Sequence, residues 1–395
     1  MSEQTTGKGF RPSILSAFLK SILIISLSLF LRADIASSQS NIDLFGYFQV
    51  YFGQVHERFL YENQAFNFSN EYEKDRNAFL LQQLNLFLRK EITEDLTAWI
   101  NLEIKNNYSS ERFWGTLNLE EAWVKYYGSN SLVVKAGLLI PQFNNLNEVK
   151  NRMPYLPYIL RPAVYESSIS QLITIDDYFP HQANLQVYGV FPLQDANVEY
   201  AAYIGNSEAA FITSENTKSI QSGVDTTNHF LLGGRVGLKA KHFKVGVSAT
   251  FDKDNQTTTG LGEVNRRRVG GDLSFNIYRF NVETEIIRVF HNENSPISLD
   301  KLFYYGTLGY DFTDQLFGYV TYNYIEDDFM PALDHGFKGI SFGGGYRFNE
   351  DLVLKAQYYN FFADRRRLPP ASDIPIPVDF EFKTEAINLG LSVSF

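Results

Sequence analysis

The sequence predicts an all-β fold, a transmembrane antiparallel β-barrel of about 16 strands with a long constriction loop. Three observations predict it. The chain begins with a predicted export signal. Apolar and polar residues then alternate with a period of two, and short connections between the predicted strands alternate with long ones. A closed sheet can cross hydrocarbon because it gives every backbone N–H and C=O a partner and leaves no edge.

The amino-terminal segment, residues 1–38, is predicted to be a cleaved signal peptide. Positive residues precede an apolar run over 21–31, and small residues follow it, with the expected cut after Ser38. The run is shorter than the roughly 20 residues that a spanning helix needs, which favours a signal peptide over a membrane anchor. We therefore expect the mature barrel to occupy residues 39–395.

Composition excludes several classes of protein. The chain has 34 Phe and 24 Tyr but no Cys, so disulfides, thiol catalysis and cysteine-ligated metals are excluded. Its mean hydropathy of −0.21 does not fit a bundle of membrane helices. The formal net charge of −10 makes nucleic acid a poor candidate partner. We expect no metal and no cofactor.

Period-2 alternation continues from residue 42 to the end of the chain. In residues 96–105, Leu96, Ala98 and Ile100 share one face and polar side chains share the other. We expect strands over residues 42–52, 78–90, 95–105, 114–127, 131–140, 181–191, 196–205, 229–239, 243–251, 265–277, 280–290, 300–312, 315–325, 336–348, 351–361 and 380–395.

The connections between these strands alternate in length. Short turns such as 91–94 and 128–130 are followed by long polar loops. Short periplasmic turns and longer external loops are typical of a membrane barrel, and an even number of strands returns both termini to the same side. The predicted long loops are 53–77, 106–113, 141–180, 206–228, 252–264, 291–299, 326–335 and 362–379.

Two local features qualify the alternation. Tyrosine pairs near strand ends fit the aromatic girdles at the membrane interfaces, or they simply reflect the high β-propensity of tyrosine. The pairs are Tyr126 and Tyr127, Tyr304 and Tyr305, and Tyr358 and Tyr359.

The phase of the alternation also slips at three places, where β-bulges are expected. These are Glu120 and Glu121, Ile286 and Ile287, and Ala386 and Ile387.

The connection over residues 141–180 is the most informative one. It has about 40 residues, and connections of such length are commonly functional or disordered. If it folds into the barrel, its charged side chains are candidates for a pore constriction, where rings of charge set ion selectivity. If it forms an external lid, the same charges are solvated. They are Glu148, Lys150, Arg152, Arg161, Glu166, Asp176 and Asp177.

The alternation also predicts which charged side chains of the wall face the lumen. The cations are Lys105, Lys125, Lys135, Arg235, Lys239, Lys244, Arg347 and Lys355. The acids are Glu103, Glu199, Asp272, Glu283 and Glu285. The arginine triplets 266–268 and 365–367 fall at or near external loops, where they funnel anions, bind lipopolysaccharide or are simply solvated.

Enzymes and hydrophobic-substrate transporters are the alternatives to a pore. Barrel hydrolases need a Ser–His pair or paired Asp and His residues at the rim, and the spacing of the six His marks no such site. We therefore expect no enzyme. A transporter of hydrophobic or other specific substrates usually carries an amino-terminal plug, and here the first strand begins at about Ile42.

The whole mature chain resembles the 16-stranded porins, in particular the phosphate-selective porin O and P family. The resemblance lies in NIDLFGYFQVYFG (41–53), VKAGLLIPQFNN (134–145), ILRPAVYE (159–166) and LGLSVSF (389–395). The family's ladder of arginines cannot be mapped onto this chain residue by residue.

The resemblance implies a third long loop folded into the barrel. It also implies homotrimers in the outer membrane of a Gram-negative bacterium, among lipid and lipopolysaccharide. The implied activity is passive diffusion of small hydrophilic solutes or ions, with anions such as phosphate as candidates. The terminal pattern Leu391, Val393 and Phe395 resembles the signal read by the barrel assembly machinery.

Overall fold

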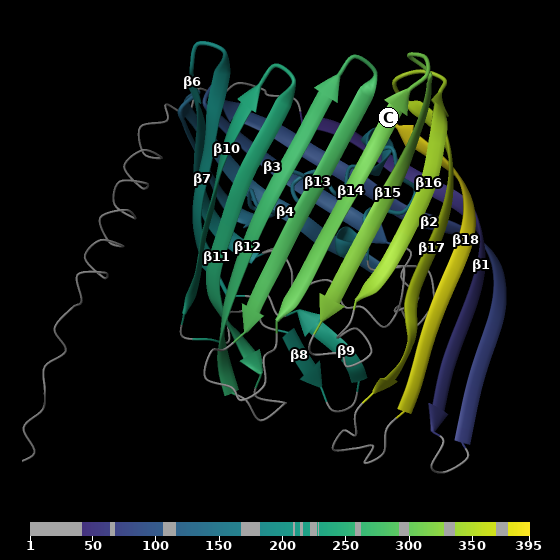
Figure 1. Ribbon diagram of the computed structural model, residues 1–395. Helices are drawn as coiled ribbons and strands as arrows, with labels where there is room; N and C mark the ends of the chain where they lie inside the picture. Colours follow the sequence, from purple (N-terminus) through teal and green to yellow (C-terminus); the bar gives the residue numbers. More distant parts are fainter. Residues whose placement is uncertain are drawn as a thin grey trace, which may run out of the picture.

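Sixteen strands of the described chain close into one antiparallel barrel (Figure 1). The computed structural model describes residues 42–63, 68–105, 116–166, 182–207, 210–213, 216–221, 227, 229–256, 262–291, 300–327, 336–368 and 378–395. The predicted signal peptide lies outside these residues. No helix among them is long and apolar enough to cross a membrane.

The barrel strands pair in chain order, and β1 closes the sheet by pairing with β18. They are β1 (Asp43–Asn63), β2 (Phe68–Thr93), β3 (Leu96–Lys105), β4 (Thr116–Ser129), β5 (Leu132–Leu139), β6 (Gln182–Pro192), β7 (Ala196–Asn206), β10 (Phe230–Ala240), β11 (Phe243–Gln256), β12 (Gly262–Ile277), β13 (Phe280–His291), β14 (Lys301–Asp311), β15 (Leu316–Asp327), β16 (Phe337–Arg347), β17 (Leu352–Leu368) and β18 (Val378–Ser394).

The short turns lie at one end of the barrel, together with the carboxyl terminus, and the strand ends that precede and follow the long connections lie at the other (Figure 1). The predicted fold and strand number are therefore confirmed. One predicted loop, 206–228, contains a hairpin of its own, formed by β8 (Ala210–Thr213) and β9 (Asn216–Gln221).

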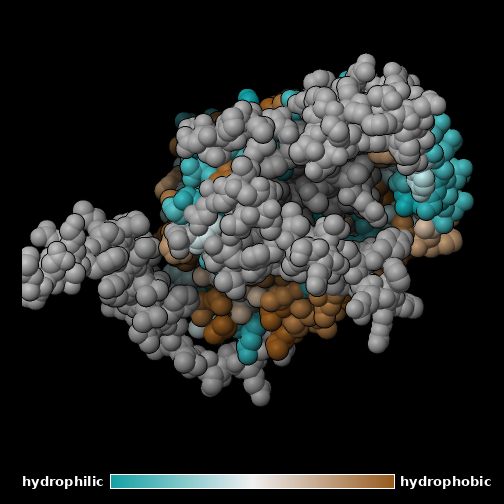
Figure 2. Space-filling model, turned by 90° about the horizontal axis from the view of Figure 1, so that it is seen from below, coloured by the Kyte–Doolittle hydropathy of each residue, from teal (hydrophilic) through white to brown (hydrophobic). Residues whose placement is uncertain are grey.

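Four neighbouring strands extend well past the others at the end with the long connections. β1 and β2 have 21 and 26 residues, so most of the loop predicted over 53–77 is strand. Here the apolar alternation gives way to cross-strand ion pairs, such as His56 with Asp75 at 2.8 Å and Arg58 with Glu71 at 2.9 Å. The extension is thus held by charges that stay in water. Hydrophilic side chains gather over it on the right of Figure 2.

The outer face of the shorter part of the barrel is apolar. Leu232, Val236 and Val247 are each more than half exposed on β10 and β11, as a lipid-facing surface requires. In two of the predicted girdle pairs, one tyrosine of each pair faces outward and the other faces inward. Tyr305 and Tyr359 are buried on the inner face, so the girdle interpretation is wrong for them.

One of the three expected bulges is present. Asn101 pairs with Glu121 and Leu102 with Leu119, which leaves Glu120 as the extra residue of β4. The other two expectations are wrong, because the pairing runs without a break past Ile287 and Ala386. Both side chains face inward, where apolar groups of the long loop cover them.

The long loop after β5 folds into the barrel. Its described part, 141–166, contains two short 3-10 helices, η1 (Met153–Tyr155) and η2 (Ala163–Tyr165). Apolar loop side chains, including Phe143, Leu146 and Ile159, form a buried cluster with inward-facing residues of β13 to β18. An external lid is therefore excluded for this part of the loop, and the predicted constriction loop is confirmed.

Candidate pore constriction

The loop is fastened to the β17 wall by two inward-facing side chains. The Lys355 ammonium donates hydrogen bonds to the carbonyls of Met153 at 2.6 Å, Leu156 at 2.7 Å and Tyr158 at 3.2 Å. Gln357 accepts from the backbone N–H of Leu160 at 2.6 Å and donates back to its carbonyl at 3.0 Å. Lys355 was predicted to face the lumen and does so, but the loop buries it.

A carboxylate on β13 holds the beginning of the loop. Glu285 accepts hydrogen bonds from the backbone N–H of Asn145 at 2.9 Å and of Leu146 at 2.6 Å. Its other oxygen accepts from the Tyr165 hydroxyl at 2.5 Å. A carboxylate that accepts hydrogen bonds from two backbone N–H groups in this way leaves the loop few alternative positions. Glu285 is therefore a fastening of the loop rather than a solvated wall charge.

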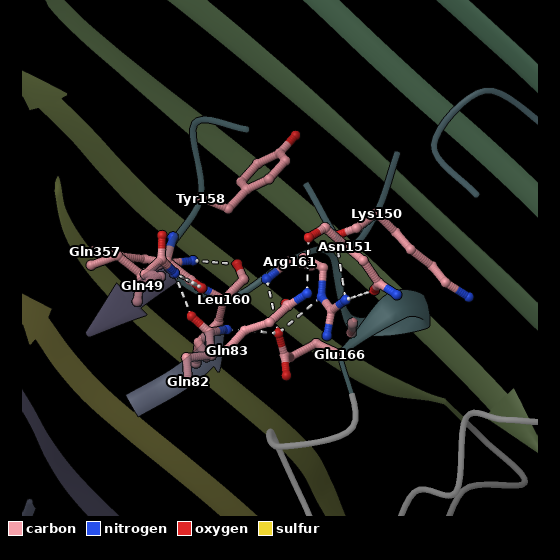
Figure 3. A network of polar contacts seen from close by, with 12 residues as sticks. Gln49, Gln82, Gln83, Lys150, Asn151, Tyr158, Leu160, Arg161, Glu166 and Gln357 are labelled. Atoms are coloured by element: carbon pink, nitrogen blue, oxygen red, sulfur yellow. Dashed lines mark hydrogen bonds and ion pairs between the residues drawn. The ribbon is translucent and has the colours of Figure 1, made fainter. Parts of the chain in front are cut away.

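The opposite edge of the loop is tied to β1, β2 and β4. The Asn151 side chain donates to Glu120 at 2.6 Å, and its carbonyl accepts from Gln83 at 2.9 Å and from the Tyr47 hydroxyl. Arg161 donates to the Asn151 amide oxygen at 2.6 Å (Figure 3). The bulge residue Glu120 thus binds the loop, a role that the sequence could not show.

The predicted constriction residues divide into three groups. Arg161 and Glu166 are buried and paired with each other at 3.3 Å, and Lys150 is buried above the Tyr165 ring. Arg152 is exposed and Glu148 is half-buried, so these two present charge to the lumen. Asp176 and Asp177 lie outside the described residues.

Glu148 lies among charges from three strands and from the loop itself. Desolvation inside the barrel raises the pKa of its carboxyl, and Glu121 of β4 raises it further. Lys135 of β5, Arg152 of the loop and Lys244 of β11 lower it, with a smaller combined effect. The loop edge at Glu148 and Arg152 therefore faces a charged strip of wall.

This charged strip consists of inward-facing side chains of β4, β5, β7 and β10 to β12, and many of them are paired. Arg235 contacts Asp272 at 2.6 Å, and Lys244 contacts Glu199 at 2.9 Å. Lys135 lies 3.7 Å from Glu121. In the part of the chain that the structure describes, Lys125, Lys239 and Arg152 have no carboxylate within ion-pair distance. The strip thus holds cations with unneutralised charge.

The remaining predicted wall charges are also placed. Glu103 is buried beside Gln83 at 2.7 Å, and the Lys105 side chain lies outside the described residues. Arg347 pairs with Asp311 at 3.2 Å. Glu283 and Arg347 line a cavity of about 320 Å³ between the loop and the β12–β17 wall.

Two arginines of the first triplet differ from the expectation of solvation. Arg266 and Arg268 face inward from β12 and are fully buried. Both contact Asp252 of β11, at 2.6 Å and 3.2 Å. They lie inside the barrel because the even-numbered positions of β12, which include Asp272, face inward. The side chains of 365–367 lie outside the described residues.

Sequence reasoning missed a row of inward-facing rings near the short-turn end. Phe45, Phe87, Trp99 and Trp123 contact one another in sequence across β1 to β4. The signal was present in the alternation, since Trp99 falls on the same face as Thr97 and Asn101. We found no group of His, Asp or Glu side chains arranged to hold a metal among the residues described.

The sequence matches no protein-family model and no curated protein. Solved structures with this fold include an anion-selective porin from Comamonas acidovorans, 12% identical with a TM-score of 0.57, aligned over 90% of this chain and 100% of its own. The outer membrane channel DcaP of Acinetobacter baumannii is 12% identical with a TM-score of 0.59, over 91% and 99%. Salmonella typhi OmpF is 13% identical with a TM-score of 0.53, over 90% and 98%. At these identities the likeness shows a shared fold.

Proposed function

We propose that this chain is an outer-membrane pore of a Gram-negative bacterium for passive diffusion of small hydrophilic solutes and ions. The observation that supports this most is the loop fastened inside the barrel by Lys355, Gln357 and Glu285. A loop held at many points narrows a lumen without filling it with a mobile plug. The apolar outer face and the porin fold of the structural neighbours agree with this function.

We further propose a preference for anions, with phosphate among the candidate solutes. Lys125, Arg152 and Lys239 have no carboxylate partner among the described residues. Glu148, the loop acid that interacts with Arg152, Lys135 and Lys244, has a raised pKa because it is desolvated, and so ionises less readily than an ordinary carboxyl. Positive charge at a narrow point attracts anions and repels cations.

Purified, refolded protein in planar bilayers tests both proposals. Stepwise conductance in potassium chloride is expected, and bilayers that stay silent at high protein loading would exclude a pore. In a salt gradient the reversal potential should have the sign of chloride preference. Inhibition of chloride current by phosphate would support the phosphate-selective porin family; absence of inhibition would argue against that specificity.

Export and assembly complete the proposal. Residues 1–38 are removed as a signal peptide, and the mature chain assembles into homotrimers through the barrel assembly machinery. Phe395 exchanges two backbone hydrogen bonds of 2.9 Å with Gly46, so the carboxyl terminus is part of the closed sheet. The mass of the mature chain tests the cut after Ser38, and cross-linking in membranes tests the trimer. That the chain is not an enzyme stays a prediction, tested by lipase and peptidase assays.

A further inference from the structure

The row of inward-facing rings on β1 to β4 is a continuous aromatic surface. Phe45 and Phe87 stack at 5.3 Å, and Phe87 and Trp99 lie 5.1 Å apart. Trp99 and Trp123 stack at 5.5 Å with only 11° between their planes. The lumen of a diffusion pore is ordinarily polar, so these rings require an explanation.

Packing against the loop does not explain the row. The buried apolar clusters around the loop contain wall residues of β13 to β18, with Tyr51, Val55 and Phe59 of β1 packed against them, and none of these four rings. Phe45 is 37% exposed, and Trp99 and Trp123 are half-buried, so ring surface remains accessible from the lumen. The indole nitrogen of Trp99 has no hydrogen-bond partner among the residues that the structure describes.

Cations border the row. Lys135 lies over the Trp123 ring, 4.3 Å from its centroid. Arg89 pairs directly with Trp99 across β2 and β3. Lys125, two residues from Trp123 on the same face, lines a cavity of about 490 Å³ together with Tyr127 and Tyr188. Space for a ligand is therefore present next to a cation that has no carboxylate partner among the described residues.

We propose that this row is a binding track for anions that carry a flat ring, the class represented by aromatic carboxylates. The faces of Trp99 and Trp123 are covered by each other, by Phe87 and by Lys135. The ring of such a solute therefore stacks on the two indoles edge to face, the T-shaped geometry that aromatic pairs also adopt. Its carboxylate contacts Lys125, with Arg89 and Lys135 contributing to the positive field. The inference rests on the proposed pore function and names a solute class for it.

The charges beside the rings favour an anion over a neutral sugar or an amine. Arg89, Lys125 and Lys135 border the row, against Glu91, which pairs with Arg89, and Glu121, which accepts from the Trp123 indole at 3.0 Å. Both carboxylates thus already have partners, whereas the Lys125 ammonium has none among the described residues. Asp43, two residues from Phe45 and opposite Arg89 at the end of the row, is the acid beside these rings that has no ion pair within the described residues.

The test uses benzoate as the probe and acetate as the control anion, in bilayers that contain the conducting protein. Benzoate at millimolar concentration is expected to reduce or to interrupt the chloride current, while acetate at the same ionic strength leaves it unchanged. Equal effects of the two anions would overturn the proposal, and so would block by glucose without block by benzoate. Failure of all conductance would instead overturn the proposed pore.

Matched variants locate the site. Trp99→Leu and Trp123→Leu should each raise the half-blocking concentration of benzoate by about tenfold. Phe317→Leu, which removes an inward-facing ring from the opposite wall, should leave it unchanged. Lys125→Gln should weaken benzoate without restoring any effect of acetate. Unchanged block in both tryptophan variants would overturn the proposal.

A second measurement does not depend on the folding of variants. Two of the chain's three tryptophans lie in the row, so a solute that stacks there must change the tryptophan emission of the folded wild-type protein. Benzoate should give a saturable change in detergent solution, with acetate as the control. A linear, unsaturable response would indicate quenching by collision and overturn the proposal.

Discussion

The inner wall of the barrel has two sectors that differ in chemistry although their outer faces are alike. On β13 to β18 the inward positions include Ile287, Phe303, Tyr359 and Phe361, all buried under the loop. On β4, β5 and β10 to β12 the inward positions are mostly charged or polar, as at Lys135 and Arg235. The difference follows from what covers each sector. Where apolar side chains of the loop lie on the wall, the inner face is an apolar core. In the other sector many of the inward side chains are paired with one another, and Arg235 and Asp272 are buried as an ion pair.

The comparison teaches that inward polarity in such a barrel is not a property of the strands alone. Burial of apolar surface stabilises the folded state by roughly 25 cal/mol per Å² removed from water. Apolar side chains are therefore favoured at the inward positions on which the loop lies. Among the buried polar groups of that sector, Glu285, Asn323, Lys355 and Gln357 form hydrogen bonds with loop backbone. The β13–β18 sector thus makes the apolar contacts of the loop, while the charged sector also binds it, through Glu120 and Ser248.

Removing the fastening at Lys355 should have the largest effect. In Lys355→Met three loop carbonyls lose their charged donor, and each buried unsatisfied group costs about 1–3 kcal/mol. The loop should then sample positions away from the wall, which raises the unit conductance and the current noise in single-channel records. Lys241→Met is the matched control, since that side chain is exposed in the short turn between β10 and β11 and no hydrogen bond joins it to the described loop. Identical records for both variants would contradict the role of the loop contacts.

Reversing the charge of a loop arginine should change ion selectivity when the arginine is exposed to the lumen and not when it is buried. Arg152→Glu changes the charge at the lumen edge by two units, and at such short range one unit is worth about 1 kcal/mol per passing ion in water. We expect the reversal potential in a salt gradient to move toward cation preference, corresponding to a roughly tenfold change in permeability ratio.

Arg161→Glu serves as the counterpart, because Arg161 is buried and paired with Glu166. Placing a second carboxylate there should loosen the loop and lower its resistance to proteolysis. The noise of the current should increase more than its selectivity changes. An equal selectivity shift in the two variants would show that Arg161 also lies in the ion path.

The barrel itself could be predicted from the sequence because a lipid-facing surface imposes alternation on every strand. Outward residues such as Val247 and Leu389 supplied that pattern regardless of what lay inside. Strand ends were predicted less well. β1 and β2 continue beyond the membrane, where ion pairs such as Arg58 with Glu71 stabilise their pairing. No hydrophobic alternation marks this part of the two strands.

The candidate site could be predicted only in part, because the path of the loop depends on contacts between distant residues. Glu285 and Lys355 were correctly expected to face inward, yet nothing nearby in sequence shows that both hold loop backbone. Ile287 and Ala386 were interpreted as bulges because the loop core that covers them was not foreseen. Arg161 and Arg152, similar in sequence terms, differ only in which side of the folded loop they occupy.

The smallest expected effect concerns the pH dependence of the charged sector, through Glu148. Burial raises the pKa of this carboxyl, and it faces Glu121, Lys135, Arg152 and Lys244. Because the pKa is raised, Glu148 takes up its proton at a higher pH than an ordinary glutamate as the pH falls. Protonation removes a negative charge from the loop edge, so anion preference should increase on mild acidification, by about twofold to fivefold in permeability ratio. In Glu148→Gln the reversal potential should already have its low-pH value at neutral pH and lose this step. A step that persists in the variant would assign it to another acid.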